Sequence, residues 1–509
     1  MPARRFTLIA LAAFALYLPA SLYAPMGIDP AASDAGSPQL PCVNQHMLQA
    51  RAWLGEPVTI HVAGQPTTIP IQPRLDITPY ILAEQIAPND RRNSLALADL
   101  AVIPGQPTQP AQSLGQTIQA LPEHAPIVHH VGFPPGPSIL LLPFRYLLGQ
   151  HAAVQWIAPL FAALTIALAD WLIGWWLRQT SPNAGSQPAP ALRNLLTLLA
   201  AGGWQLGWLA VNPGVWHFAH ICAILSLTAA LAANARGWPL LAAVAWALAI
   251  ASRPATLLAA PFLLIQTAHH IRQTAGSHLA STPARFALHT ALLAVAPLIM
   301  LAAMLAHNAA RFGSPFEFGY AHMQLADLPA ERLAAHGQFS PHWIADNLYT
   351  FFIAPPVLHT ETTPLGNAKP AWPWIISDPL GMGAVFFAPA CLLALLALRP
   401  APMKQPLVVA AWLSALLALF PALLYFNTGW VQWGARFLTD AWILWLLITA
   451  RGAADLPHNA RRYLLGWLVT LSLFSNAWAV YCTAAGGWPP RQTNPVIRVI
   501  EGGSVMQLD

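Results

Sequence analysis

Long apolar runs are the feature of this sequence that most limits what it can fold into. A helix needs about 20 mostly apolar residues to cross a bilayer, and every backbone polar group inside the hydrocarbon must be paired. Eleven runs reach or approach that length, at roughly 6 to 24, 152 to 177, 193 to 212, 214 to 234, 238 to 252, 254 to 268, 285 to 307, 381 to 399, 405 to 426, 430 to 450 and 462 to 483. We therefore expect an all-α polytopic membrane protein with about eleven transmembrane helices in a single integral membrane domain, residues 1 to 509.

The composition agrees with this class and excludes several others. Hydrophobic residues make up 56% of the 509 residues and charged residues only 8%, whereas a soluble domain carries about 25% charged residues. Disordered chains and nucleic-acid-binding surfaces need far more charge. The four cysteines form no CxxC pair, and the sequence contains no HExxH, GxSxG, P-loop or GxGxxG motif. The motifs of metal sites, serine hydrolases, ATPases and dinucleotide enzymes are thus missing.

Two segments decide how the chain crosses the membrane. The run 138–149 is only about twelve residues long, follows a proline-rich turn and contains Arg145. It is too short to span, so we predict a re-entrant or interfacial helix. The run 238–268 is interrupted by Ser252-Arg253-Pro254. A single helix there would place Arg253 in the middle of the membrane, so we predict a pair of short helices with Arg253 at their outer junction.

The Lys/Arg bias of the short loops then sets the orientation. The inner side holds only two acids, Asp170 and Asp455. It collects twelve cations, namely Arg4, Arg5, Arg178, Arg193, Arg236, Arg272, Arg285, Arg399, Lys404, Arg451, Arg461 and Arg462. The bias predicts a cytoplasmic N-terminus and a periplasmic C-terminus.

This orientation leaves two long loops and a tail on the outer side. The first periplasmic loop is 25–151 and includes the re-entrant helix, the second is 308–380, and the tail is 484–509. Neither loop shows the alternating strands of a separate domain. The stretch 60–71 predicts one hairpin at most.

Three arginines from separate runs share the outer membrane level. They are Arg253, Arg311 and Arg436, and Asp440 follows Arg436 at the i to i+4 spacing that lets two charges pair on one helix face. Ionisable residues are costly at this depth. One interpretation is interfacial snorkelling with an internal ion pair. The other, which we favour, is a cationic pocket for a lipid phosphate.

The first outer loop supplies the remaining candidates. His129 and His130 precede the turn 133–137, and Arg145 follows it, so all three are candidates for the headgroup level. The candidate acids or bases are Asp29, Asp76 and Asp99, of which Asp29 lies only about five residues beyond the first apolar run. Adjacent histidines do not have the spacing of helical metal ligands, so we expect no metal site and no cofactor; a divalent metal stays an open alternative without support.

The layout resembles the polytopic GT-C glycosyltransferases, most closely the bacterial family 39-like proteins. The matching local strings are FPPGPSILLLP at 133–143, SRP at 252–254, RFGSPFEFGY at 311–320 and GARFLTD at 434–440. The resemblance covers most of the chain and implies a multi-pass protein of the bacterial inner membrane with its active site at the outer interface. The implied donor is a sugar on a polyprenyl phosphate, and the acceptor is a glycan, lipid or protein hydroxyl.

The reaction implied by this resemblance fits the residues already named. The polyprenyl phosphate leaves as an anion, which guanidinium groups such as Arg253 and Arg436 stabilise. The attacking hydroxyl needs a carboxylate base. Relatives of this kind carry an essential Asp in the first outer loop, and Asp29 matches that place, while Asp76 and Asp99 are equally admissible. The alternatives are a transporter or lipid flippase without glycosyl transfer, and a noncatalytic assembly protein.

Overall fold

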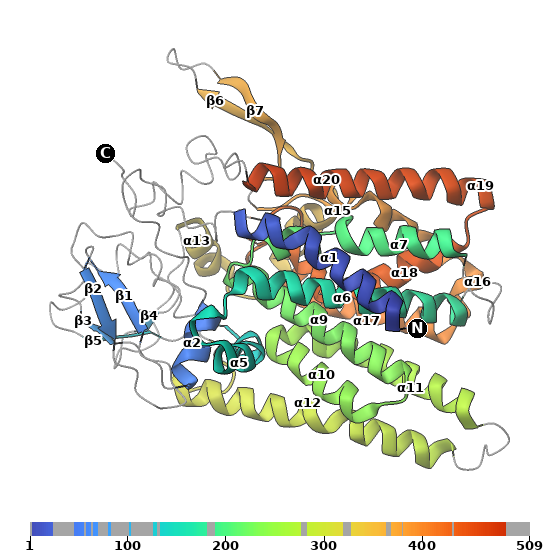
Figure 1. Cartoon of the computed structure of the whole chain (residues 1–509), viewed down its shortest axis with the longest axis horizontal. Helices are drawn as coiled ribbons and strands as arrows, with labels where there is room; N and C mark the ends of the chain where they lie inside the picture. The colour runs from blue at the N-terminus through green and yellow to red at the C-terminus, as the bar shows by residue number, and fades with distance from the viewer. Residues whose placement is uncertain are drawn as a thin grey trace.

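The structure, a computed structural model, describes residues 3–23, 45–54, 58–62, 65–69, 80–82, 101–102, 126–129, 133–180, 189–275, 282–318, 327–362, 368–378, 380–429 and 432–484. Long helices lie side by side in a bundle (Figure 1). Its longer helices are α1 (Ala3–Tyr23), α6 (Val154–Thr180), α7 (Pro190–Gly202), α9 (Val215–Ala235), α10 (Pro239–Ser252), α11 (Ala260–Ala275), α12 (Thr282–Phe312), α17 (Pro406–Leu424), α18 (Trp442–Ala454) and α20 (Gly466–Ala484).

Shorter elements connect these helices. The short α-helices are α2 (Gln45–Trp53), α5 (Gly136–Leu148), α8 (Leu206–Val211), α13 (Asp327–His336), α14 (Ile344–Leu348), α15 (Ala384–Phe387), α16 (Pro400–Met403) and α19 (His458–Ala460). The 3₁₀ segments are η2 (Gly149–His151), η3 (Pro254–Ala259), η6 (Pro341–Trp343), η8 (Pro389–Leu398) and η9 (Arg436–Ala441), and the π segments are η7 (Tyr349–Ile353) and η10 (Arg461–Leu465).

Seven helices of the described residues are long and apolar enough to cross a membrane. They span Arg4–Leu22, Val154–Thr180, Val215–Ala235, Pro283–Ala310, Pro406–Leu424, Arg436–Ala454 and Tyr463–Thr483. The remaining four of the eleven predicted runs form shorter or broken helices. The run 193–212 divides at Gly202 and Gly203, where α7 ends, and α8 begins at Leu206. The run 381–399 consists of α15 and the 3₁₀ segment η8. The runs on either side of Arg253 form α10 and η3 with α11, the pair of short helices that the sequence predicts.

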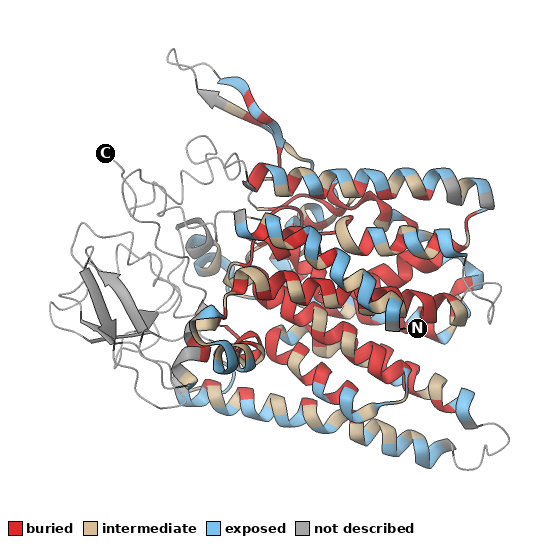
Figure 2. Ribbon diagram, viewed as in Figure 1, coloured by how far each residue is buried: buried red, intermediate tan, exposed pale blue. Residues whose placement is uncertain are grey.

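The bundle has a buried centre and an apolar outside. Every residue of α18 is buried, as are most residues of α6 and α9. Figure 2 shows buried residues gathered in the middle of the bundle and exposed residues along α12 and α20. Many of those exposed side chains are large and apolar, for example Leu298 and Ile299 on α12 and Trp467 and Phe474 on α20. Large apolar side chains exposed in this number are stable in contact with lipid but not in contact with water. This is therefore a multi-pass membrane protein.

The two ends of the bundle differ. α2, α5 and α13 lie at one end, whereas the N-terminus, α16, α19, the last turn of α11 and the first turn of α12 lie at the other (Figure 1). The predicted re-entrant helix is α5, whose thirteen residues are too few to span and which packs against α2 and α10. Helix ends at the second end carry Arg178, Arg272 and Arg285. These three of the twelve cations that the positive-inside analysis grouped together therefore share one end.

The loops contain more β-structure than the sequence predicts. β1 (Val58–Val62) pairs antiparallel with β2 (Gln65–Ile69), which is the expected hairpin. A second sheet has the strand order β3-β5-β4, and β6 pairs with β7 in a hairpin. The other two sheets were not predicted. Strands β3, β4 and β5 have only two to four residues, too few to show alternation, whereas β6 and β7 have six and nine residues and were missed. The remaining strands are β3 (Tyr80–Leu82), β4 (Ala101–Val102), β5 (Pro126–His129), β6 (Val357–Thr362) and β7 (Ala368–Ile376).

Candidate functional site

Arg253 lies where two short helices meet. Pro254 disfavours helical backbone at the residue before it, and Arg253 adopts the extended conformation with φ −146° and ψ 102°. α10 therefore ends at Ser252 and η3 begins at Pro254. The break aims the Arg253 side chain at η9, the segment that contains Arg436 and Asp440.

Asp440 joins these two segments through a bidentate ion pair. Nε of Arg253 donates to Oδ1 of Asp440 and Nη2 donates to Oδ2, both at 2.9 Å. The Asp440 side chain is only 2% exposed. The pairing expected between Arg436 and Asp440 assumes α-helical geometry. η9 is a 3₁₀ helix, in which residues i and i+3 align, so Thr439 stands in line with Arg436 and its hydroxyl donates to the Arg436 carbonyl.

Two buried histidines on α9 complete the polar group. Nδ1 of His220 lies 3.1 Å from Oδ1 of Asp440 and 2.9 Å from the Thr439 hydroxyl. Nδ1 of His217, one turn earlier, lies 2.8 Å from the carbonyl oxygen of Asn212. Nε2 of both rings is buried and has no hydrogen-bond partner among the described residues.

Aromatic rings lie close to both arginines. The guanidinium group of Arg436 lies 5.1 Å from the ring centre of Trp216 and 5.3 Å from that of Phe437. The guanidinium group of Arg253 also lies 5.3 Å from the Phe437 ring centre. Cations at this distance are attracted by the negative face of an aromatic ring. We call Arg253, Arg436, Thr439, Asp440, His217 and His220 the arginine–histidine cluster.

The proline-rich turn 133–137 packs directly against the end of α10, next to Arg253. Gly136 approaches the backbone of Ala251 and Ser252 so closely that a Cβ atom there would overlap both. Ser138, two residues later, donates to Oε1 of Gln49 at 2.5 Å and lies 3.4 Å from Nδ1 of His46, so α5 also contacts α2. Three of the four strings that carry the GT-C resemblance therefore contact one another in a chain, from the turn to the SRP junction to η9.

His46 is a neutral group in this contact. Burial lowers the pKa of His46 to about 3, although a hydrogen bond with the backbone of Val215 acts in the opposite direction. The imidazole ring also faces Phe133, with ring centres 5.9 Å apart. His46 therefore links α2 to the start of α9, two residues before His217.

The other predicted site residues fall into two groups. Arg145 is on α5 and donates to the carbonyl of Gly149 at 2.7 Å, which caps its own helix. Arg311 is near the end of α12 and His129 ends β5 opposite Ala101, but the side chains of both lie outside the described residues. His130 and the three candidate bases also lie outside them, namely Asp29, Asp76 and Asp99.

The cluster is suited to binding an anion. It contains two guanidinium groups and one carboxylate, so with neutral histidines these residues carry one excess positive charge in a mostly buried setting. In the part of the chain that the structure describes, no three His, Cys, Asp or Glu side chains are grouped closely enough to hold a metal ion. Comparison of the chain with protein-family models, curated proteins and solved structures finds no match.

Proposed function

We propose that this protein is a GT-C type glycosyltransferase that transfers a sugar from a polyprenyl-phosphate donor to an acceptor on the periplasmic side of the bacterial inner membrane. The observation that carries the proposal is that Arg253 and Arg436, 183 positions apart in the sequence, both lie 5.3 Å from the ring centre of Phe437. A guanidinium group fits a phosphate geometrically and stabilises negative charge that grows on it as the sugar leaves.

The two arginines have different roles in this proposal. Asp440 accepts two hydrogen bonds from Arg253 and so fixes the direction of its guanidinium plane. Arg253 therefore orients the site, and Arg436 is the principal partner of the donor phosphate. Arg436 is only 5% exposed, while Trp216 above it is half-buried. The donor phosphate reaches Arg436 when the Trp216 ring moves aside.

The general base is assigned to the first outer loop. An attacking hydroxyl needs a carboxylate within hydrogen-bond reach, and Asp440 is unsuited because its oxygens already accept from Arg253. Asp29 is the favoured base, with Asp76 and Asp99 as the alternatives. The contacts of the turn 133–137 with Ser252 support this assignment, since they bring the end of that loop to the cluster.

A transfer assay tests the proposal. Membranes containing the overexpressed full chain are given a panel of radiolabelled polyprenyl-phosphate hexoses, and label in acceptor material is measured. We expect transfer by the wild type and a loss of about 100-fold in Arg436→Gln, the scale seen when one stabilising donor of a transition-state anion is removed. Arg285→Gln, which removes an exposed arginine at the other end of the bundle, is the matched control and keeps full activity.

The same preparation separates the alternatives. Asp29→Asn abolishes transfer if Asp29 is the base, and a normal rate moves the assignment to Asp76 or Asp99. Normal rates in all three variants exclude Asp29, Asp76 and Asp99 as the base. Wild-type membranes that transfer no label from any donor, yet show counterflow of a soluble solute, contradict the proposal and identify a transporter.

A further inference from the structure

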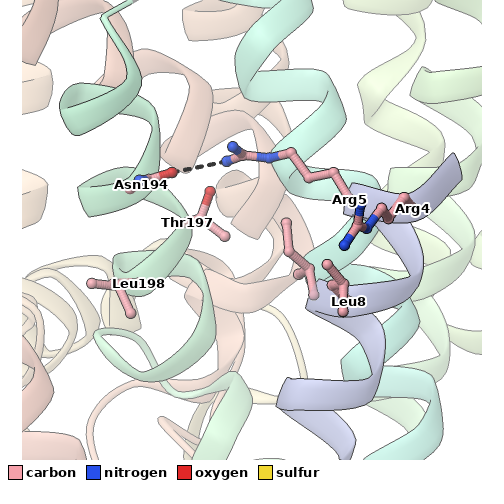
Figure 3. A pocket seen from close by; sticks show the side chains of 7 residues that line it. Arg4, Arg5, Leu8, Asn194, Thr197 and Leu198 are labelled. Atoms are coloured by element: carbon pink, nitrogen blue, oxygen red, sulfur yellow. Dashed lines mark hydrogen bonds between the residues drawn. The ribbon is translucent and has the colours of Figure 1, made fainter. Parts of the chain in front are cut away.

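An open groove lies between α1 and α7 at the end of the bundle that holds the N-terminus. Its volume is about 610 Å³. α1 lines it with Arg4, Arg5, Leu8 and Ile9, and α7 lines it with Asn194, Thr197 and Leu198. Figure 3 shows the labelled side chains of the two helices facing each other across it, joined by a hydrogen bond from Arg5 to Asn194 of 2.9 Å. The groove is separate from the arginine–histidine cluster.

A single carboxylate under the groove is shared by two arginines. Asp170 is fully buried, and both of its oxygens accept hydrogen bonds from Arg5, at 2.8 and 3.1 Å, and from Arg193, at 2.5 and 3.0 Å. Thr197 donates to the same carboxylate at 2.8 Å. Arg4, which is exposed, adds a third guanidinium group at the mouth. These four charged residues therefore carry two excess positive charges.

The lining changes from charged to apolar along the groove. Leu8 and Ile9 lie four positions after Arg4 and Arg5, which places them about 6 Å further along the helix axis. Leu8 is 58% exposed and Leu198 on the facing helix is 51% exposed. A free phosphate ion gains nothing from contact with these apolar walls. A phospholipid carries its phosphate and its acyl chains in the same order as the charged and apolar parts of the groove.

We infer that this groove is a binding site for an anionic phospholipid of the leaflet at this end of the bundle. The lipid phosphate lies between Arg4 and Arg5, and one acyl chain follows Leu8 and Leu198. Charge complementarity selects an anionic lipid over a zwitterionic one, because the excess charge of the site attracts a net negative headgroup. The inference is independent of glycosyl transfer, since none of these residues belongs to the arginine–histidine cluster.

Lipid retention measured by native mass spectrometry tests this site. The full chain is purified and equilibrated with mixed micelles of phosphatidylglycerol and phosphatidylcholine, and bound lipids are counted. We expect preferential retention of one phosphatidylglycerol by the wild type. Arg4→Gln lowers its affinity about fivefold, the effect of one arginine near an anionic lipid surface. Leu198→Trp fills the apolar part of the groove and lowers retention without changing charge.

Arg399→Gln is the matched control, because Arg399 is an exposed arginine of the same group of twelve and does not line the groove. It leaves retention unchanged. Competition by inorganic phosphate separates the two sources of the anion, and displacement of the lipid by millimolar phosphate overturns the lipid assignment. Equal retention in the wild type, Arg4→Gln and Leu198→Trp, or no preference for phosphatidylglycerol, also overturns it. Every variant is first shown to keep the thermal unfolding profile of the wild type.

Discussion

Asp440 is the residue on which the arrangement of the arginine–histidine cluster depends. Its carboxylate accepts from Arg253 and lies beside His220, so it connects the α10 junction, η9 and α9. Both partners are mostly withdrawn from solvent, with 22% of the Arg253 side chain and 2% of the Asp440 side chain exposed. Removing one partner of such a pair leaves the other charge without compensation, which costs far more than the pair itself contributes.

We therefore expect Asp440→Ala to destabilise the protein by about 3 kcal/mol. The measurement is reversible unfolding in mixed detergent micelles. Asp346→Ala is the control, because the Asp346 side chain is 59% exposed and lies 3.8 Å from Arg332. A surface pair of that kind contributes about 0.5 kcal/mol or less. Equal losses in the two variants would contradict the structural role of Asp440.

The protonation of His46 predicts how stability depends on pH. Burial lowers the pKa of His46 to about 3, whereas an unfolded histidine titrates near 6.5. Between these values only the unfolded state takes up the proton, so stability falls as the pH falls. At pH 5 the loss from this residue is about 2 kcal/mol.

Unfolding of the wild type and of His46→Gln at pH 7 and pH 5 checks this prediction. The variant cannot take up the proton, so its stability changes less between the two pH values. A wild type and a variant with the same pH dependence show that His46 does not titrate as described.

Single residues also show where sequence reasoning succeeds and where it stops. Arg253, Arg436 and Asp440 are identifiable because charge at membrane depth is costly and rare. His217 and His220 were not predicted, since a histidine in an apolar run is usually a core residue. Their i to i+3 spacing within one run was the available signal. The partner of Asp440 was not predictable, because it depends on the 3₁₀ geometry of η9.

At the scale of elements, the contact between α5 and the α10 junction positions the turn 133–137. Gly136 permits this contact because its missing side chain lets two backbones meet. We expect Gly136→Ala to separate α5 from Ser252, to lower the unfolding temperature and to reduce glycosyl transfer together. Gly466→Ala is the control, because a Cβ there meets no atom within 4 Å. If Gly136→Ala has the same unfolding temperature and transfer rate as Gly466→Ala, the close packing of the turn contributes to neither stability nor transfer.

The elements themselves were predictable to different degrees. Apolar length alone located α6, α9, α12 and α17 within a few residues. Pro254 identified the break at Arg253, because proline restricts the residue before it. The 3₁₀ character of η8 was not predictable, since a continuous apolar run does not encode the pitch of its helix.

At the scale of the whole molecule, charge divides the bundle into two unlike ends. The Arg5–Asp170–Arg193 group and the Arg451–Asp455 pair belong to the end with the N-terminus. The Lys/Arg bias predicts that this end faces the cytoplasm. A periplasmic phosphatase fused near Pro188 is then inactive, and one fused near Gly366 is active. The reverse pattern contradicts the orientation and places the arginine–histidine cluster on the wrong side for a periplasmic acceptor.

We propose that the arginine–histidine cluster holds the phosphate of a polyprenyl lipid. The most direct measurement is photolabelling of the full chain with a polyprenyl phosphate that carries a diazirine beside its phosphate, followed by peptide mass spectrometry. We predict labelled peptides from the start of α9, around Trp216, and from η9, around Phe437, with labelling lost in Arg436→Gln. Labelling confined to other helices, or unchanged in that variant, contradicts the account.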